Sequence, residues 1–334
     1  MSNLSKAACI GGGVIGAGWA ARLALNGIPV SMFDPDPEAP RKVSEVMANA
    51  RRAFAAMAPD GLPKEAEITL AGSIAEAVNG ADLIQESVPE RLDTKHKVLA
   101  EIDRHAAADA IVGSSTSGIK PTDMAPAMAR PERLVVAHPY NPVYLLPLVE
   151  IVPGEMTSTE AVSRATDLYA SIGMKPVTIR KEIEAFVGDR LLEAVWREAL
   201  WLIKDGICTV EELDDIMRYS FGLRWAQMGM FQVYRIAGGE AGMRHFMAQF
   251  GPCLTWPWTK LMDVPEFNDE LVDLIAGQSD DQSGKWSIRE LERIRDDNLV
   301  AIMDALSKQN GGEGWGAGAL LNDFRVKLAA KAGV

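Results

Sequence analysis

The chain has 334 residues, which is long enough for two domains. Its 34 basic and 46 acidic residues give a net charge of −12, which argues against nucleic acid or an anionic membrane surface as a partner. The three cysteines, Cys9, Cys208 and Cys253, are scattered, so we expect no metal cluster and a reducing compartment such as the cytoplasm. No apolar stretch is long enough for a membrane span, and the first apolar run reads as a strand rather than a signal peptide.

A glycine-rich loop follows that first strand, at residues 6–10, and precedes a helical stretch at 19–25. It fits the G-x-G-x-x-G pattern, in which glycines let the backbone approach a pyrophosphate and a helix N-terminus supplies N–H groups. An acid ends the second strand 18 residues beyond Gly16, where its carboxylate would bind the adenosine ribose and repel a 2′-phosphate. The pattern predicts an NAD site made of Gly11, Gly13, Val14, Ile15, Gly16 and Asp34.

Short β-rich runs alternate with helical stretches as far as residue 182, which is typical of a doubly wound α/β sheet. From residue 185 onward only helical periodicity remains, as in 186–204 and 210–219. We therefore predict a Rossmann-type NAD-binding domain at 1–183 and an all-α domain for substrate binding and dimerisation at 184–334. The candidate strands lie at 6–10, 29–33, 81–86, 110–114, 133–138, 148–152 and 175–179.

Ser117, His138 and Glu150 carry the candidate chemistry. Ser117 follows one strand and His138 closes the next, and ligands of open α/β sheets bind outside the carboxyl ends of strands. Glu150 interrupts an apolar strand, where an unpaired carboxylate would be costly, so His138 is its expected partner. A hydroxyl, an imidazole and a carboxylate are the groups needed to move a proton while a nicotinamide exchanges a hydride.

Together these motifs resemble the 3-hydroxyacyl-CoA dehydrogenase superfamily. The resemblance implies that His138 is the general base, that Glu150 orients it and that Ser117 binds the substrate oxygen. It places Asn141 near the reaction centre and Glu90 and Lys95 beside the nicotinamide. The motifs that carry it are the glycine loop, Glu86-Ser87-Val88-Pro89-Glu90 with Lys95, the loop at 114–118, His138-Pro139-Tyr140-Asn141-Pro142, and Leu148-Val149-Glu150.

Stretches at 221–226, 237–246 and 256–261 are similar to the branch of that superfamily that acts on L-carnitine. This similarity implies NAD-dependent oxidation of the 3-hydroxyl of L-carnitine, a zwitterion whose quaternary cation aromatic faces can bind. Asp189 stands where the acyl-CoA members carry an active-site asparagine, and Arg190 and Arg224 are candidates for the substrate carboxylate. The candidate aromatic residues are Tyr140, Tyr144, Phe221, Trp225, Phe231 and Tyr234.

Other activities stay open from the sequence. A neighbouring branch acts on L-gulonate, and the acyl-CoA members act on short-chain 3-hydroxyacyl-CoA. A non-catalytic NAD-binding protein of the crystallin type is a further alternative, although such a protein need not keep Ser117, His138 and Glu150. The aromatic and methionine content of the helical domain predicts a homodimer.

Overall fold

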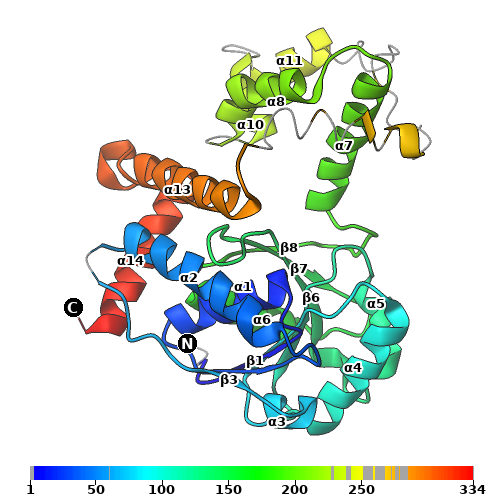
Figure 1. Ribbon diagram of the computed structural model, residues 1–334, viewed down its shortest axis with the longest axis vertical. Coiled ribbons are helices and arrows are strands. Elements are labelled where there is room, and N and C mark those ends of the chain that lie inside the picture. The colour runs from blue at the N-terminus through cyan, green and yellow to red at the C-terminus, as the bar shows by residue number, and fades with distance from the viewer. Residues whose placement is uncertain are drawn as a thin grey trace. The chain divides into compact units, whose positions relative to one another are not determined.

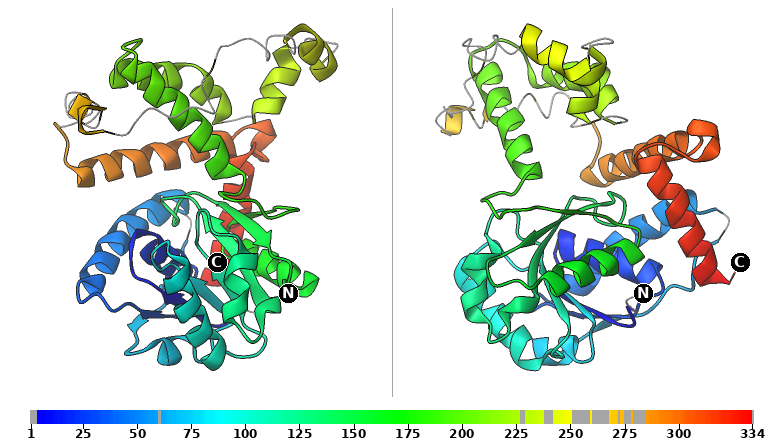
Figure 2. Two further views of the ribbon diagram at one scale, coloured as in Figure 1. Left: turned by 90° about the vertical axis from the view of Figure 1, so that its right-hand side faces the viewer. Right: turned by 180° about the vertical axis from the view of Figure 1, so that it is seen from behind.

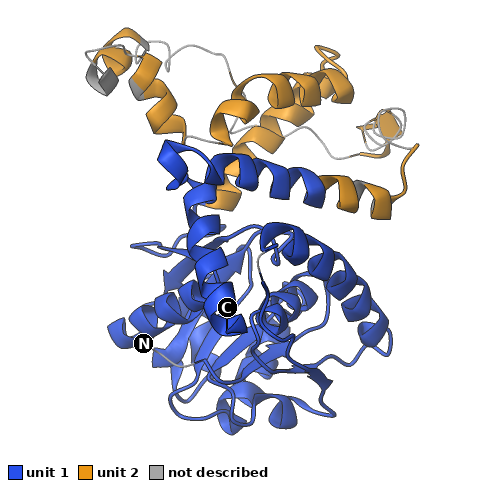
Figure 3. Ribbon diagram, turned by 90° about the vertical axis from the view of Figure 1, so that its left-hand side faces the viewer, with its two compact units in different colours: residues 1–187, 296–334 blue, residues 188–295 orange. Residues whose placement is uncertain are grey.

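The computed structural model describes residues 4–59, 61–226, 229–237, 242–250, 259, 268–271, 273–274, 278 and 285–333. The chain forms two compact units, coloured separately in Figure 3: residues 1–187 with 296–334, and residues 188–295. Cys253 and most of the motif stretch at 256–261 lie outside the described residues, as do residues 238–241 of the stretch at 237–246.

The first unit is built on one eight-stranded sheet in the order β3-β2-β1-β4-β5-β6-β7-β8. Strands β1 to β6 run parallel, β7 runs antiparallel to β6, and β8 runs parallel to β7. The central strands β1, β4, β5 and β6 are buried along their whole length, as expected of a parallel sheet covered on both faces. The strand bounds are β1 Ala7–Ile10, β2 Val30–Phe33, β3 Ile68–Leu70, β4 Leu83–Glu86, β5 Ile111–Ser114, β6 Leu134–Pro139, β7 Leu148–Pro153 and β8 Lys175–Thr178.

Helices cover both faces of this sheet (Figures 1 and 2). Successive side chains of a strand point to opposite faces, so Cys9 and Ile10 of β1 belong to two different apolar clusters. The Cys9 cluster includes α1 (Val14–Leu25), α2 (Ala39–Met57) and α6 (Thr159–Ser171). The Ile10 cluster includes α3 (Ile74–Val78), α4 (Leu92–His105) and α5 (Pro121–Met124). The fold is therefore the doubly wound α/β fold that the sequence predicts.

The end of the chain returns to this first unit. Leu321, Phe324 and Leu328 of α14 (Ala317–Ala332) are buried in the Cys9 cluster, and the Phe324 ring meets Phe54 of α2 edge-on at 5.7 Å. Val300 and Met303 of α13 (Ile288–Ser307) join the same cluster. The sequence predicts one boundary between 183 and 184, whereas the structure groups residues 296–334 with the first unit, because these helices cover apolar surface of α1 and α2.

Within the described residues of the second unit every regular element is helical. The elements are α7 (Gly188–Lys204), α8 (Val210–Tyr219), α9 (Phe221–Trp225), α10 (Met230–Ala237), α11 (Gly242–Phe250) and the first part of α13. The Thr209 hydroxyl and the Glu212 carboxylate form a capping box that fixes the start of α8. Among the helices described, none combines the length and apolarity that a bilayer crossing requires.

Candidate functional site

The predicted cofactor loop and the residues Ser117, His138 and Glu150 lie at the carboxyl edge of the sheet. The ends of β1, β4, β5 and β6 all meet at this edge because the four strands are parallel. The strand order reverses between β1 and β4, and such a reversal is where open α/β sheets bind their ligands.

The glycine loop after β1 leaves no room for side chains where it packs on the sheet. A Cβ on Gly11, whose φ is +104°, would lie 2.5 Å from the Ser87 carbonyl oxygen, and one on Gly16 would lie 1.9 Å from the Gly11 oxygen. At Gly13, by contrast, a Cβ would meet nothing within 4 Å, and this residue starts α1 without a side-chain cap. The start of α1 is thus open to a ligand, and helix N-termini with free N–H groups are where dinucleotide pyrophosphates bind in this kind of fold.

Asp34 lies directly beyond β2, beside the same loop. Its Oδ2 accepts the Gly12 N–H at 2.5 Å and its Oδ1 accepts the Asp36 N–H at 2.7 Å. Val14, at the start of α1, is 62% exposed, and Ile15 is partly buried. The loop thus presents a fixed carboxylate and an exposed helix start next to each other, as the adenosine end of NAD requires.

His138 and Glu150 lie directly opposite each other on the antiparallel strands β6 and β7. Nδ1 of His138 is 2.9 Å from Oε2 of Glu150, and both residues are 3% exposed. The Tyr140 hydroxyl donates to the same Oε2 at 3.0 Å, and the backbone N–H of Val187 donates to Oε1 at 3.1 Å. The hydrogen-bonded carboxylate fixes the orientation of the imidazole, which is the arrangement of a general base and its orienting group.

The segment that ends the first unit contributes to this pair. Ala185 and Phe186 have φ values of +59° and +48°, a conformation that residues with a side chain rarely adopt and that tends to occur at functional sites. Phe186 is fully buried, and its ring centroid lies 5.6 Å from that of His138. Nothing in the local sequence pattern identified Phe186 or the Val187 N–H as parts of the site, because their contacts to β6 and β7 are distant in sequence.

Ser117 and Asn141 lie exposed in the loops that follow β5 and β6. The buried Arg22 of α1 holds the loop of Asn141 by a hydrogen bond. Its guanidinium donates to the carbonyl oxygen of Val143 in that loop at 2.8 Å, and also to the carbonyl oxygen of Ile172, after α6, at 3.1 Å. Burial lowers the pKa of Arg22 to about 9. Sequence reasoning missed this arginine, since a basic residue inside an apolar helix gives no sign of its distant partners.

The predicted substrate residues fall into different settings. Tyr144 is 4% exposed, and its hydroxyl donates to Asp296 of α13 at 2.6 Å, so little of its ring remains for a substrate. In the second unit Phe221 and Trp225 of α9 face each other with ring centroids 4.7 Å apart, and Trp225 is 42% exposed. Phe231 of α10 is 71% exposed, and the Tyr234 ring stacks on Phe246 at 4.5 Å. Asp189 and Arg190 lie in the first turn of α7, and Arg224 is an exposed residue of α9.

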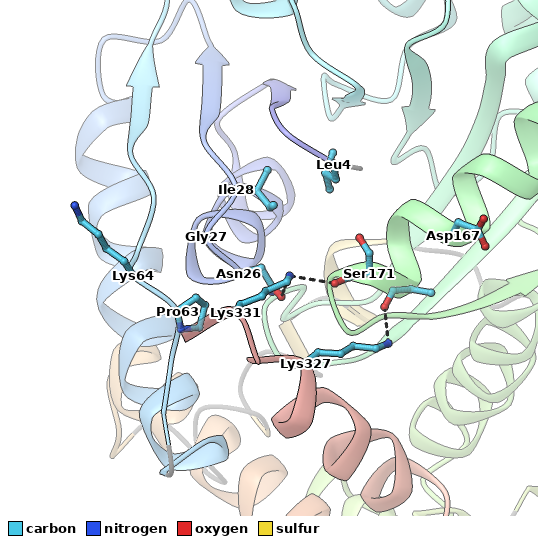
Figure 4. A pocket seen from close by; sticks show the side chains of 11 residues that line it. Leu4, Asn26, Gly27, Ile28, Pro63, Lys64, Asp167, Ser171, Lys327 and Lys331 are labelled. Atoms are coloured by element: carbon cyan, nitrogen blue, oxygen red, sulfur yellow. Dashed lines mark hydrogen bonds between the residues drawn. The ribbon is translucent and has the colours of Figure 1, made fainter. Parts of the chain in front are cut away.

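A hollow of about 1050 Å³ lies at the other end of α1, around Asn26, the residue that follows the helix (Figure 4). Two of its lysines cap α6: Lys327 Nζ donates to the Ala170 oxygen at 3.1 Å, and Lys331 Nζ donates to the Ser171 oxygen at 3.2 Å. This hollow is separated from Gly13 by the length of the helix and is not part of the predicted site. Across the described residues, no cluster of three potential metal ligands is found.

Comparison with known protein families and structures gives consistent matches. The model described as the 3-hydroxyacyl-CoA dehydrogenase NAD binding domain matches residues 6–183, and the model of the C-terminal domain of the same name matches residues 186–263. A Mesorhizobium japonicum protein named L-carnitine dehydrogenase is 79% identical over 99% of this chain and 92% of its own length. A Rhizobium meliloti protein named L-carnitine dehydrogenase/betainyl-CoA thioesterase is 64% identical, and the chain spans 67% of it.

Solved structures share the fold. The chain is similar, with a TM-score of 0.77 and 30% identity, to 5-formyl-3-hydroxy-2-methylpyridine 4-carboxylic acid 5-dehydrogenase, an NAD⁺-dependent dismutase. That similarity covers 92% of this chain and 100% of the other. A 3-hydroxybutyryl-CoA dehydrogenase from Escherichia coli gives a TM-score of 0.58 at 23% identity, over 83% of this chain and 57% of its own, and shows the fold alone.

Proposed function

This chain belongs to the 3-hydroxyacyl-CoA dehydrogenase family, and on that premise we propose that it oxidises the 3-hydroxyl of L-carnitine to 3-dehydrocarnitine with NAD. The choice of L-carnitine as the substrate rests on one observation: the chain is 79% identical, over nearly its whole length, to a protein named L-carnitine dehydrogenase. The buried pair of His138 and Glu150 at the carboxyl edge of the sheet supports the reaction type.

NAD, when bound, accepts the hydride that leaves the carbinol carbon. We propose that the start of α1 binds its pyrophosphate, through the loop residues Gly11 and Gly13 and the first turn from Val14 to Gly16. Asp34 would hold the ribose hydroxyls and repel a 2′-phosphate. The carboxylate is already fixed by the Gly12 N–H, which keeps it beside the loop.

His138 is proposed to take the hydroxyl proton on Nε2 as the C–O bond becomes C=O. Nδ1 faces Glu150 at 2.9 Å, so the carboxylate fixes the tautomer and stabilises the imidazolium that forms. Ser117 would donate its hydroxyl to the substrate oxygen, and Asn141 lies in the adjacent loop as a second polar group. The hydride leaves the carbinol carbon with two electrons and the proton leaves the hydroxyl oxygen. The substrate therefore loses two electrons in all, both of them to NAD.

The trimethylammonium group of L-carnitine makes no conventional hydrogen bonds, and each good cation–π contact contributes about 0.5–2 kcal/mol. Tyr140, Phe221, Trp225, Phe231 and Tyr234 stay candidates for these contacts, while the burial of Tyr144 disfavours it. Arg190 and Arg224 are proposed for the carboxylate end. Asp189 replaces the asparagine of acyl-CoA members and is proposed to contribute to the choice of substrate.

The test is to compare substrates by NADH formation. We expect kcat/KM for L-carnitine to exceed that for L-gulonate or 3-hydroxybutyryl-CoA by about tenfold or more, because an apolar aromatic pocket leaves gulonate hydroxyls without partners, at about 1–3 kcal/mol each. γ-Butyrobetaine, which lacks the hydroxyl, is expected to inhibit competitively without turnover, and choline is not expected to turn over. Equal or faster oxidation of L-gulonate would assign the chain to the neighbouring activity and discard the aromatic site.

We further propose that the helical residues from 184 onward provide substrate and dimer contacts, while residues 1–183 bind NAD. Exposed apolar side chains on α7 and α8 support a homodimer, since monomers rarely leave such faces uncovered. They include Leu191, Leu192, Trp196, Ile216 and Tyr219. Light scattering that gives the mass of one chain at micromolar concentration would exclude the dimer. A cytoplasmic location, where NAD and reduced thiols such as Cys9 are maintained, completes the proposal.

A further inference from the structure

A row of hydrogen-bonded polar side chains leads from the core of the first unit to the carboxyl edge of the sheet. It starts at Tyr169 of α6, passes through Gln85 of β4 to Ser115, which follows β5, and ends at Ser87, which follows β4. Tyr169 is fully buried and Gln85 is 1% exposed, whereas Ser87 is partly exposed. A Cβ on Gly113 of β5 would clash with the Tyr169 hydroxyl, so the glycine makes room for this polar row.

The direction of the hydrogen bonds in the polar row is set at its buried end. The Tyr169 hydroxyl lies 2.5 Å from Oε1 of Gln85 and has no other hydrogen-bond partner among the described residues. Burial raises the pKa of Tyr169, so the phenol keeps its proton and donates it to Gln85. The amide is therefore oriented with Nε2 toward Ser115, because the reversed amide would leave a buried hydroxyl proton without an acceptor.

Ser115 passes this direction on to Ser87. Its Oγ accepts Nε2 of Gln85 at 2.7 Å and Nε1 of Trp19 at 3.1 Å. An indole N–H can only donate, and a hydroxyl oxygen has two lone pairs, so both lone pairs of Ser115 are occupied. The Ser115 proton then goes to its remaining neighbour, Oγ of Ser87, at 2.9 Å. Ser87 accepts this bond, and its own proton is left to donate elsewhere.

Ser87 lies between the glycine loop and the first turn of α1. Its N–H donates to the carbonyl oxygen of Ile10 at 2.7 Å, and a Cβ on Gly16 would lie 3.4 Å from the Cβ of Ser87. The strand order reverses here, between β1 and β4, where open α/β sheets bind their ligands. In the part of the chain that the structure describes, Ser115 is the one hydrogen-bond partner of the Ser87 hydroxyl. The uncommitted proton is therefore at the place where the dinucleotide is proposed to bind.

The segment that carries Ser87 is held from both sides. The Glu86 carboxylate accepts the Val88 N–H at 2.7 Å, and the Lys95 ammonium donates to Glu86 at 2.9 Å and to the Val88 carbonyl oxygen at 3.3 Å. Lys95 also lies 3.4 Å from Oε2 of Glu90, so both residues that the sequence places beside the nicotinamide adjoin this segment. A donor fixed in advance loses little conformational entropy when a ligand accepts its hydrogen bond.

We propose that Ser87 is a further cofactor-binding residue, whose hydroxyl donates to an oxygen of the dinucleotide, and that the polar row keeps this proton directed at the cofactor. The acceptor is an oxygen of the pyrophosphate or of the ribose next to it, since these parts of NAD lie at the start of the first helix in a fold of this kind. This inference rests on the proposed function, because it takes the placement of NAD at α1 from there.

The experiment measures the dissociation constant of NADH by fluorescence titration for Ser87→Ala in the full chain. Affinity should fall by about 10- to 100-fold if the acceptor is a charged phosphate oxygen, and by about 3- to 10-fold if it is a ribose oxygen. ADP and ADP-ribose, measured by competition with NADH, separate the two. A loss with ADP as well assigns the bond to the pyrophosphate, and a loss with NADH and ADP-ribose alone assigns it to the ribose. A loss confined to NADH would overturn the proposal.

Gln85→Glu tests the direction of the polar row, measured at about pH 8.5 so that the new carboxyl is ionised. A carboxylate has no N–H for Ser115, so it accepts the Ser115 proton, and Ser87 then donates inward to Ser115. NADH affinity should fall as far as in Ser87→Ala, and adding Ser87→Ala to this variant should change it by less than about twofold. Unchanged affinity in a folded Gln85→Glu protein would show that the row does not direct the proton. If that variant does not fold, Ser87→Ala decides alone.

The matched control is Ser171→Ala. The Ser171 hydroxyl is also partly buried and donates to the Leu168 carbonyl oxygen at 2.7 Å, but it lies at the end of α6 beside the hollow, so NADH affinity should not change. Binding is measured without substrate, which separates this test from that of the proposed function. An unmodified protein that binds NADH but does not oxidise L-carnitine would refute the proposed substrate only. NADH affinity of Ser87→Ala within about twofold of the unmodified protein would refute the role of Ser87, whatever the substrate.

Discussion

Replacing Glu150 with Gln removes the negative charge that faces His138 while keeping the shape of the side chain. Both residues are 3% exposed, so solvent screens their interaction little. The imidazole becomes positively charged when it takes the substrate proton, and a hydrogen bond to a charged group contributes about 1.5–3 kcal/mol. Losing it should lower kcat by about 10- to 150-fold. The effect should be smaller than that of His138→Gln, since a positioned base contributes about 10²–10⁴-fold.

Initial rates of NADH formation with saturating L-carnitine and NAD measure this effect, and fluorescence titration shows whether NADH still binds normally. Glu155→Gln is the matched control, because Glu155 is exposed and lies shortly after β7. A Glu150→Gln enzyme within about twofold of the unmodified kcat would show that the carboxylate does not assist His138. A loss larger than that of His138→Gln would instead mean that Glu150 itself is the base.

Three further changes test other parts of the molecule. Asp34→Ser should lower the ratio of kcat/KM for NAD to that for NADP, because it removes the charge that repels a 2′-phosphate. Efficient use of NADP by the unmodified protein would contradict this role of Asp34. Gly173→Ala should lower the free energy of unfolding by about 2–4 kcal/mol, because φ is +77° and the new Cβ would clash with the Phe324 ring. Gly80→Ala is the control: φ is +69° but a Cβ there would meet no atom within 4 Å, so the free energy of unfolding should fall by only about 1–2 kcal/mol. Asp103→Asn should destabilise by about 1–3 kcal/mol at neutral pH in urea unfolding. Burial opposes ionisation of Asp103, but the hydrogen bonds from Arg133 and the Ala129 N–H outweigh it and lower the pKa of the carboxyl. This stability is present above the unfolded pKa and is lost as pH falls through the lowered folded-state pKa. The difference between the two proteins should therefore begin to shrink below about pH 4 and disappear only at lower pH.

Much of the first unit follows from local patterns. Seven of the eight strands were expected within two residues of their observed bounds, because each is a short apolar run between polar turns. The missing one, β3 (Ile68–Leu70), has three residues that are not fully buried and therefore lacks that contrast. The reversed direction of β7 was not predicted, although the loop at 140–147 is too short for the crossover that a parallel neighbour needs.

The sequence predicts the candidate catalytic residues, but not the hydrogen bonds that hold them in place. Ser117 and His138 were predicted because they are polar residues at strand ends, and Glu150 because it interrupts an apolar strand. The contacts that hold them come from elsewhere in the chain: Tyr140 and Val187 on Glu150, and Glu90 on the Ser117 turn. A hydrogen bond between two loops leaves no periodic trace in the sequence, so its partners cannot be read from spacing.

The return of α14 to the first unit has a consequence for synthesis. Phe54, on α2, has Phe324 as an aromatic partner, and Gly173 packs against the same ring. While the ribosome is still making residues 188–295, this apolar surface has no cover, although every strand of the sheet has already been synthesised. The nascent first unit should therefore expose this apolar surface, which can bind other apolar surfaces, until α14 has been synthesised and packs on it. A fragment that ends after residue 187 should, for the same reason, aggregate or bind chaperones rather than fold alone, even though it contains the whole sheet.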